Sequence, residues 1–393
     1  MLTQRGDVAF PAAANSFKDA VTSGNHLYVV TGVADMRDYN LSTLALNYIA
    51  PLNVSLTGTG ITMVNTATAC ISYATATVDF VNVNTGQRTT ITSGTAGTTN
   101  SNYGQQIAGN INTGFAMATK TSGVTFINSL TQAATALNPS SVFTGQNSTV
   151  ITVKPTTNTW LVGSSKGQVY EINAQGALVQ TLNLPITSTS TTATTQVVGI
   201  SYASPNMACT TDRGELFIYN WTTQTLVYRA LLGGWDGSAG ALLCPAASGT
   251  CLIGRGLSTS INEIGELYFE TCDPTIGQVF WNESNANSRA IGFEPSLNIA
   301  WSIQNASNFM QIRTYNMSPT AKVNVDTRFQ DPPGTDVAAR IIRLRDDGIG
   351  ILSIENDTNI PAAVTNISAT DGKNYIEIGL EGGTQFDIRE FTA

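Results

Sequence analysis

The chain has 393 residues, of which only 12% are charged, and it carries a formal net charge of −8. An acidic chain of this kind lacks the basic surface that a nucleic-acid phosphate backbone requires, so no nucleic-acid partner is expected. Charged residues make up about a quarter of an average soluble domain. The polar surface must therefore come from the abundant Thr, Asn, Ser and Gly residues, which favour turns and strands and exclude a mainly helical fold.

The N-terminal segment, residues 1–14, has no clear place in the repeat that follows it and is expected to form an arm or a closing strand. It lacks an apolar stretch behind a basic start, so we expect no signal peptide and synthesis in a cytoplasm. No apolar run of about 18 residues occurs in the chain, and a membrane span is therefore not expected.

A short apolar run recurs along the rest of the chain at intervals of 43 to 50 residues. A strand-like segment and a turn precede each run, and a polar turn and two further strand-like segments follow it, so each repeat predicts four strands. A period in the forties without helices is typical of β-propeller blades. The runs begin at Leu27, Cys70, Phe115, Trp160, Met207, Cys251, Ile299 and Ile349.

These repeats predict an all-β fold, a single β-propeller over residues 15–393 with eight four-stranded blades. The continuous apolar character of the runs fits strands that neighbouring blades cover on both faces. The last repeat is irregular, because the polar residues 356–373 separate it from the strand-like segments 375–380 and 385–391. Seven blades stay open as an alternative, with the terminal strands completing another blade. Tandem β-sandwiches rarely keep one period over such a length, and the repeats of a β-solenoid are shorter.

The sequence has no evident catalytic centre, and we expect no enzymatic activity. His26 is the only histidine and lies in a turn, which leaves a Ser-His-Asp triad without a well-placed base. The Gly-x-Ser-x-Gly match at residues 163–167 joins two strand-like segments, so a hairpin is expected there in place of a nucleophile elbow. The side chain of Asp212 is expected to stabilise the turn in which it lies, by contacts with Arg213 or with the backbone amides of that turn. Glu266 and Glu270 are the best candidates for a hydrolase, although a solvated strand face is the favoured interpretation.

No metal site and no cofactor are expected, because calcium loops, a P-loop and a dinucleotide fingerprint are absent from the sequence. The five cysteines form no Cys-x-x-Cys pair, and buried free thiols are the expected state. Cys244 and Cys251 flank a short turn, so a disulfide between them is left open for an oxidising setting. Asn-x-Ser/Thr sequons, such as those at Asn40 and Asn220, are expected by chance in a chain this rich in Asn and Thr.

Three tryptophans are candidates for ligand or partner contacts if they lie in loops between blades: Trp221, Trp235 and Trp281. An indole offers a large apolar face together with one hydrogen-bond donor, which suits both sugars and partner proteins. Packing of these side chains between blades is the alternative for each of them.

The low charge, the single histidine, the absence of an export signal and the blades without a signature motif resemble the β-propellers of bacteriophage virions. These are tail nozzle or receptor-contacting components. The resemblance covers the whole chain, but it shares no motif, so it assigns no functional residue to this sequence. It implies a non-enzymatic structural protein of the virion, a phage tail protein whose partners are other virion proteins. The alternative is a carbohydrate- or host-receptor-binding propeller, a lectin or adhesin that contacts a glycan or receptor on the host surface.

Overall fold

The chain forms two compact units, Met1–Ser318 and Pro319–Ala393, in the computed structural model. The expected propeller range of 15–393 therefore spans two units. The residues that the structure describes are 2–11, 17–52, 58–73, 77–92, 105–185, 195–212, 215–231, 241–245, 250–256, 262–268, 273–275, 287–305, 309–317, 343–346, 352–355, 364–368, 377–380 and 385–387.

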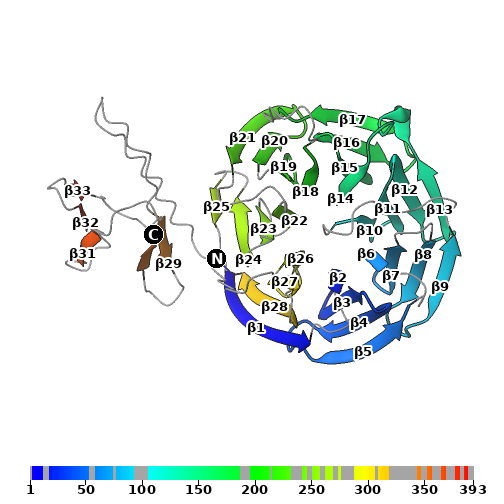
Figure 1. Ribbon diagram of the computed structural model, residues 1–393, viewed down its shortest axis with the longest axis horizontal. Helices are drawn as coiled ribbons and strands as arrows, with labels where there is room; N and C mark the ends of the chain where they lie inside the picture. The colour runs from blue at the N-terminus through cyan, green and yellow to red at the C-terminus, as the bar shows by residue number, and fades with distance from the viewer. Residues whose placement is uncertain are drawn as a thin grey trace. The chain divides into compact units, whose positions relative to one another are not determined.

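The first unit is a ring of four-stranded antiparallel sheets, the blades, arranged around a common centre (Figure 1). Six blades are continuous stretches of chain, numbered here in chain order. Blades 1 to 3 consist of β2 (Phe17–Ser23), β3 (His26–Thr31), β4 (Asp35–Asn40) and β5 (Leu46–Pro51); β6 (Gly58–Asn65), β7 (Thr68–Tyr73), β8 (Thr77–Asn82) and β9 (Arg88–Thr92); and β10 (Ile107–Asn110), β11 (Phe115–Lys120), β12 (Gly123–Asn128) and β13 (Ala133–Leu137). A short 3-10 helix, η1 (Pro139–Ser141), follows blade 3.

Blades 4 to 6 repeat the same order of strands from the centre outward. They consist of β14 (Ser148–Lys154), β15 (Thr159–Ser164), β16 (Gln168–Asn173) and β17 (Leu178–Asn183); β18 (Val197–Ala203), β19 (Asn206–Thr211), β20 (Glu215–Asn220) and β21 (Thr225–Leu231); and β22 (Ala241–Pro245), β23 (Thr250–Gly256), β24 (Asn262–Tyr268) and β25 (Asp273–Thr275).

The ring is completed by a composite sheet that joins both ends of the first unit. Its three inner strands, β26 (Asn287–Glu294), β27 (Ile299–Asn305) and β28 (Phe309–Met317), are consecutive. Its outer strand is β1 (Leu2–Pro11), which pairs antiparallel with β28 from Leu2↔Met317 to Pro11↔Phe309. The innermost strands contact one another in the circular order β2, β6, β10, β14, β18, β22, β26 and back to β2.

The expectation of eight blades is wrong. The described residues of the ring form six continuous blades and the composite sheet, and a count of seven is reached only when that sheet is included. The first seven apolar runs lie in the second strand of a blade, whereas residue 352 of the eighth belongs to β30 in the second unit. The spacing therefore identified the blade strands correctly, but a matching spacing at the C-terminal end did not add another blade.

The second unit contains two small sheets among its described residues. One pairs β29 (Arg343–Asp346) with β30 (Leu352–Glu355), and the other contains β31 (Val364–Ser368), β32 (Glu377–Leu380) and β33 (Gln385–Asp387). Within the parts of the chain that are described, no helix has the length and apolar character needed to cross a membrane.

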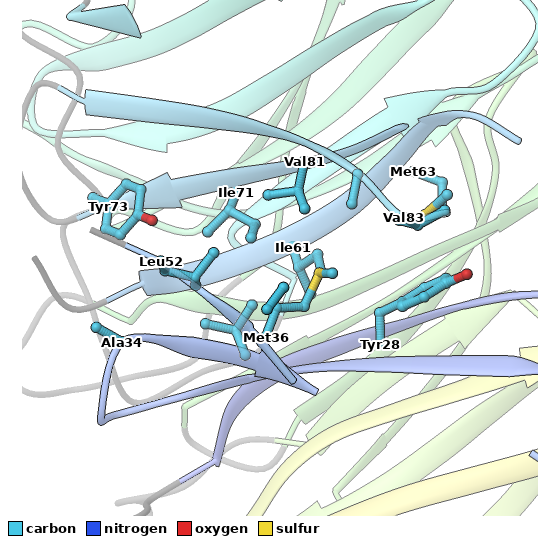
Figure 2. Close-up of a cluster of buried hydrophobic side chains, with 13 residues drawn as sticks. Tyr28, Ala34, Met36, Leu52, Ile61, Met63, Ile71, Tyr73, Val81 and Val83 are labelled. Carbon is cyan, nitrogen blue, oxygen red and sulfur yellow. The ribbon is translucent and has the colours of Figure 1, made fainter. Parts of the chain in front are cut away.

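The core of the ring lies between the blades. Figure 2 shows one such cluster, in which Tyr28 and Met36 of blade 1 pack with Ile61, Ile71 and Val81 of blade 2. Each is at most 3% exposed, and full burial of a large apolar side chain contributes about 1.5–3 kcal/mol. Because these contacts cross from one blade to the next, a single blade cannot bury its own faces.

An asparagine ends the third strand of each of blades 1 to 5 and stabilises the turn that follows: Asn40, Asn82, Asn128, Asn173 and Asn220. Its Oδ1 accepts hydrogen bonds from backbone N–H groups two to four residues further on, as in Ser42 N to Asn40 Oδ1 at 3.0 Å and Thr223 N to Asn220 Oδ1 at 3.1 Å. Such turns favour Asn because its short side chain reaches its own backbone. The sequons at Asn40 and Asn220 thus coincide with a structural feature of the repeat.

Candidate functional site

A cavity of about 230 Å³ lies at the inner wall of the ring. Its lining comes from the innermost strands β2, β6, β10, β14 and β26, together with Gln105 just before β10. Figure 1 shows these strands facing the centre from several blades. A cavity on the axis of a closed ring is positioned by blades far apart in sequence, so its shape depends on closure of the ring.

Polar side chains link each of the first innermost strands to the backbone of a later one. Asp19 on β2 accepts a hydrogen bond at Oδ2 from Ile61 N on β6, at 3.1 Å. Thr62 on β6 accepts a hydrogen bond at Oγ1 from Gly109 N on β10, at 2.8 Å. An innermost strand has one edge without a neighbouring strand, so its backbone groups need other partners. These side chains supply such partners from the preceding blade.

The same arrangement continues into blades 4 and 5. Gln106 Nε2 donates to Thr149 O of β14 at 2.9 Å, and Thr149 Oγ1 donates to Val197 O of β18 at 2.5 Å. Gln105 Nε2 reaches further and donates to Ile200 O of β18 at 3.3 Å. The inner wall is therefore held by hydrogen bonds between blades as well as by apolar packing.

Asp19 is the ionisable residue of the cavity lining. It is 5% exposed. Burial raises the pKa of its carboxyl group to about 7, although the hydrogen bonds from Ile61 N and Ala20 N act in the opposite direction. The carboxyl group therefore titrates near neutral pH, where an ordinary aspartate is fully charged.

In the described part of the ring, two buried acids are found in no ion pair, Asp19 and Glu294, and of these only Asp19 lines the cavity, since Glu294 is held by Ser296. Five other acids have a basic partner within 4 Å: Asp35 with Arg37, Asp38 with His26, Asp79 with Arg88, Glu171 with Lys154 and Glu215 with Arg229. A buried charge is costly unless a counter-charge or several hydrogen bonds offset the loss of water. Among the residues that the structure describes, Asp19 has two backbone N–H donors and no cation.

Trp221, the first tryptophan candidate, is 2% exposed and packs between blades 4 and 5. Its Nε1 donates to Glu171 Oε2 at 2.6 Å, while Lys154 Nζ and Thr159 Oγ1 lie 2.8 and 2.6 Å from Glu171 Oε1. Burial alone would raise the pKa of the Glu171 carboxyl group. The three partners together outweigh that effect, so the pKa lies below its ordinary value. Trp221 thus has the packing role that was its alternative. Trp235 and Trp281 lie outside the described residues.

The other candidates from the sequence do not come together in one site. His26 Nδ1 lies 3.0 Å from both carboxyl oxygens of Asp38, and its ring stacks on Tyr28 with centroids 5.7 Å apart. Residues 163–167 span the end of β15 and the hairpin turn that leads to β16, where Ser164 Oγ accepts hydrogen bonds from Lys166 N and Gln168 N. This hairpin is the predicted one, and Ser164 stabilises the turn.

The acidic and sulfur-containing candidates are also dispersed. Asp212 Oδ1 accepts a hydrogen bond from Gln196 N at 3.0 Å, so its partner is the segment before β18. Glu266 pairs with Leu252 in the register of β24, and Glu270 lies outside the described residues. Within the described ranges no group of three or more His, Cys, Asp or Glu side chains could hold a metal ion.

The expectation of buried thiols is confirmed for the three cysteines whose side chains are described. Cys70 and Cys209 are free and buried, and burial raises the pKa of both thiols. Cys251 is also buried, but the register pairs it with Pro245, and Cys244 with Leu252. Cys244 and Cys251 are therefore not register partners across this hairpin.

Sequence reasoning did not find the cavity, because its residues come from strands that are distant in the chain. The sequence offers no clear signal for Asp19, which lies in a mixed segment between Lys18 and Ala20. Its partner Ile61 lies 42 residues further on.

Comparison with known proteins supports the fold. No family model and no curated protein matches the sequence. One similar solved structure is a chain of the "Crystal Structure of Mitotic Checkpoint Complex", with a TM-score of 0.60, 12% identity and coverage of 81% of this chain and 93% of that chain. Another is the Myceliophteria thermophila Cps50 (Swd1) β-propeller domain, with a TM-score of 0.60, 8% identity and coverage of 81% and 100%. At these identities the likeness defines the fold class alone: an all-β protein with a single β-propeller.

Proposed function

We propose that this chain is a non-enzymatic structural component of a virus particle, in particular a phage tail protein that contacts other virion proteins. The observation that supports protein contact is the apolar rim of the ring. Exposed apolar side chains on its outer strands are Leu46 and Ile49 on β5, at 46% and 51%, Val179 on β17, at 54%, and Leu226 and Val227 on β21, at 44% and 47%. Surfaces of this kind are the ones that partner proteins cover.

The rim positions on blades 4 and 5 are neighbours. Gln224 Nε2, in the turn just before β21, donates to Thr181 O of β17 at 3.1 Å and so links this turn to the outer strand of blade 4. Val179, Leu226 and Val227, termed here the rim patch, therefore belong to adjacent blades. A rigid ring that presents such a patch can bind a partner without rearranging.

Two buried acids of the described blades, Glu171 and Glu215, are held in ion pairs, which fits a scaffold. Glu171 is fixed by Lys154, and Glu215 is fixed by Arg229 at 2.7 Å. A general acid or base must exchange its proton with a substrate, and groups bound in this way are poorly placed to do so. The receptor-binding alternative retains Trp235 and Trp281, which lie outside the described residues.

The proposal is tested by labelling purified particles with antibodies raised against the full chain. It expects the label at a fixed place on the particle, and finding the chain only in the soluble fraction of infected cells would reject it. In a complementation assay, replacing all three rim-patch residues by Ser should reduce incorporation into particles. Leu130→Ser, at a position that is 75% exposed in a turn, is the matched control and should be incorporated normally.

A further inference from the structure

We infer that the cavity at the inner wall of the ring binds an alkylammonium group, with Asp19 as its counter-charge. This assigns a ligand site to the propeller independently of the proposed role in a virus particle. The ligand is either a small free amine or the side chain of a lysine from a partner protein, and both sources present the same –CH₂–NH₃⁺ chemistry.

The charge of the site comes from Asp19. Its two oxygens each accept one backbone hydrogen bond, from Ala20 N at 2.9 Å and Ile61 N at 3.1 Å. A carboxylate offers about four acceptor positions, so a further donor can bind. Four other buried acids of the described ring have a basic partner within the fold, and Glu294 is held by Ser296 and does not line the cavity, whereas Asp19 lines an open space. An ammonium group in that space would complete the missing ion pair.

The walls of the cavity select the kind of cation. Methyl-bearing side chains make up most of the lining, including Ala20, Val21, Ile61, Ile107 and Ile151. A hard ion such as Ca²⁺ takes about six to eight oxygen ligands, which a wall of this composition does not provide. An alkylammonium ion matches both parts of the lining, because its hydrocarbon chain packs on methyl groups while its charged end meets the carboxylate.

The size of the cavity agrees with a short ligand. Its volume of about 230 Å³ equals roughly seven to eight water molecules at about 30 Å³ each. It is smaller than the range of roughly 300–1,000 Å³ typical of pockets for drug-sized molecules. A four-carbon chain with one ammonium group fits this volume, and a lysine side chain has that length.

The first test titrates the full chain at pH 8 with n-butylammonium chloride and follows binding by calorimetry and by the melting temperature. Sodium chloride at equal ionic strength and n-butanol are the controls, since they provide charge without the alkyl group and the alkyl group without charge. The inference expects saturable binding and a raised melting temperature for butylammonium alone. Equal effects of all three additives would overturn the inference. This result is obtained on the unmodified chain, so it does not depend on whether a variant folds.

The second test uses variants. Asp19→Asn should weaken butylammonium binding about tenfold or more, the loss expected for one charge-assisted hydrogen bond. Asp79→Asn removes a buried carboxylate that Arg88 already partners, so it should leave binding unchanged. Equal affinity of the Asp19→Asn variant would refute the role of this residue. A lysine derivative blocked at both backbone ends identifies the source of the ammonium group. If it binds as well as butylammonium, the site accepts the lysine side chain of a partner protein. If it binds more weakly, the ligand is a small free amine.

Discussion

Replacing Asp19 by Asn removes the one charge that the ring holds at its cavity wall without a cationic partner in its described residues. Burial raises the pKa of this group from 3.8 to about 7. The folded state therefore binds a proton more tightly than the unfolded chain between about pH 4 and pH 7, and stability falls as the pH rises through that window. Each pKa unit corresponds to about 1.4 kcal/mol, so the loss amounts to about 4 kcal/mol by pH 8.

The assay is urea unfolding of the unmodified chain and the Asp19→Asn variant at pH 4, 5, 6, 7 and 8. Other titrating groups are common to both proteins, so the difference between their unfolding free energies isolates Asp19. This difference should move in favour of the variant by about 4 kcal/mol from pH 4 to pH 8, because the amide does not ionise. A difference that stays constant with pH would refute the raised pKa and the burial that causes it.

Two further substitutions test contacts between blades. Trp221→Phe should destabilise the fold by about 1–3 kcal/mol, because a buried carboxylate oxygen of Glu171 loses its donor. Acid unfolding of this variant should begin at a higher pH. An unchanged acid midpoint would contradict the role of the hydrogen bond between Trp221 and Glu171. Gly109→Ala should cost about 1–3 kcal/mol in a thermal unfolding assay, since the added Cβ would lie 2.2 Å from Met63 O of the neighbouring blade. Gly6→Ala, whose Cβ would meet nothing closer than 3.6 Å, should be nearly neutral, and equal effects of the two would argue against the close approach.

The second strand of each blade could be predicted from the sequence because its signal is local. Six residues in a row are buried in β15, which contains Trp160, and a strand covered on both faces favours a continuous apolar run such as the Trp-Leu-Val of its centre. The turn asparagines are equally local, and a closer comparison of the repeats would have found them. The predicted hairpin at residues 163–167 is correct for the same reason.

The features that the sequence did not reveal depend on contacts between distant parts of the chain. The sequence predicts an arm or a closing strand for residues 1–14 and does not decide between them, because the partner of β1 is β28, some 300 residues away. The eighth run at Ile349 has a suitable spacing, but spacing does not determine whether a segment packs into the ring. Asp19 could not be recognised as a cavity residue before the innermost strands were known to meet at one centre.

Closure of the ring by the N-terminal strand is tested most directly by a cross-link between Val8 and Ile312, which are register partners in β1 and β28. Both positions are replaced by Cys, the protein is oxidised, and the linked peptides are identified by mass spectrometry. The composite sheet predicts one intramolecular disulfide between the two introduced thiols, with no such link in the Val8→Cys single variant. A chain that folds with both thiols still free, or that links them only between molecules, would contradict the closed ring.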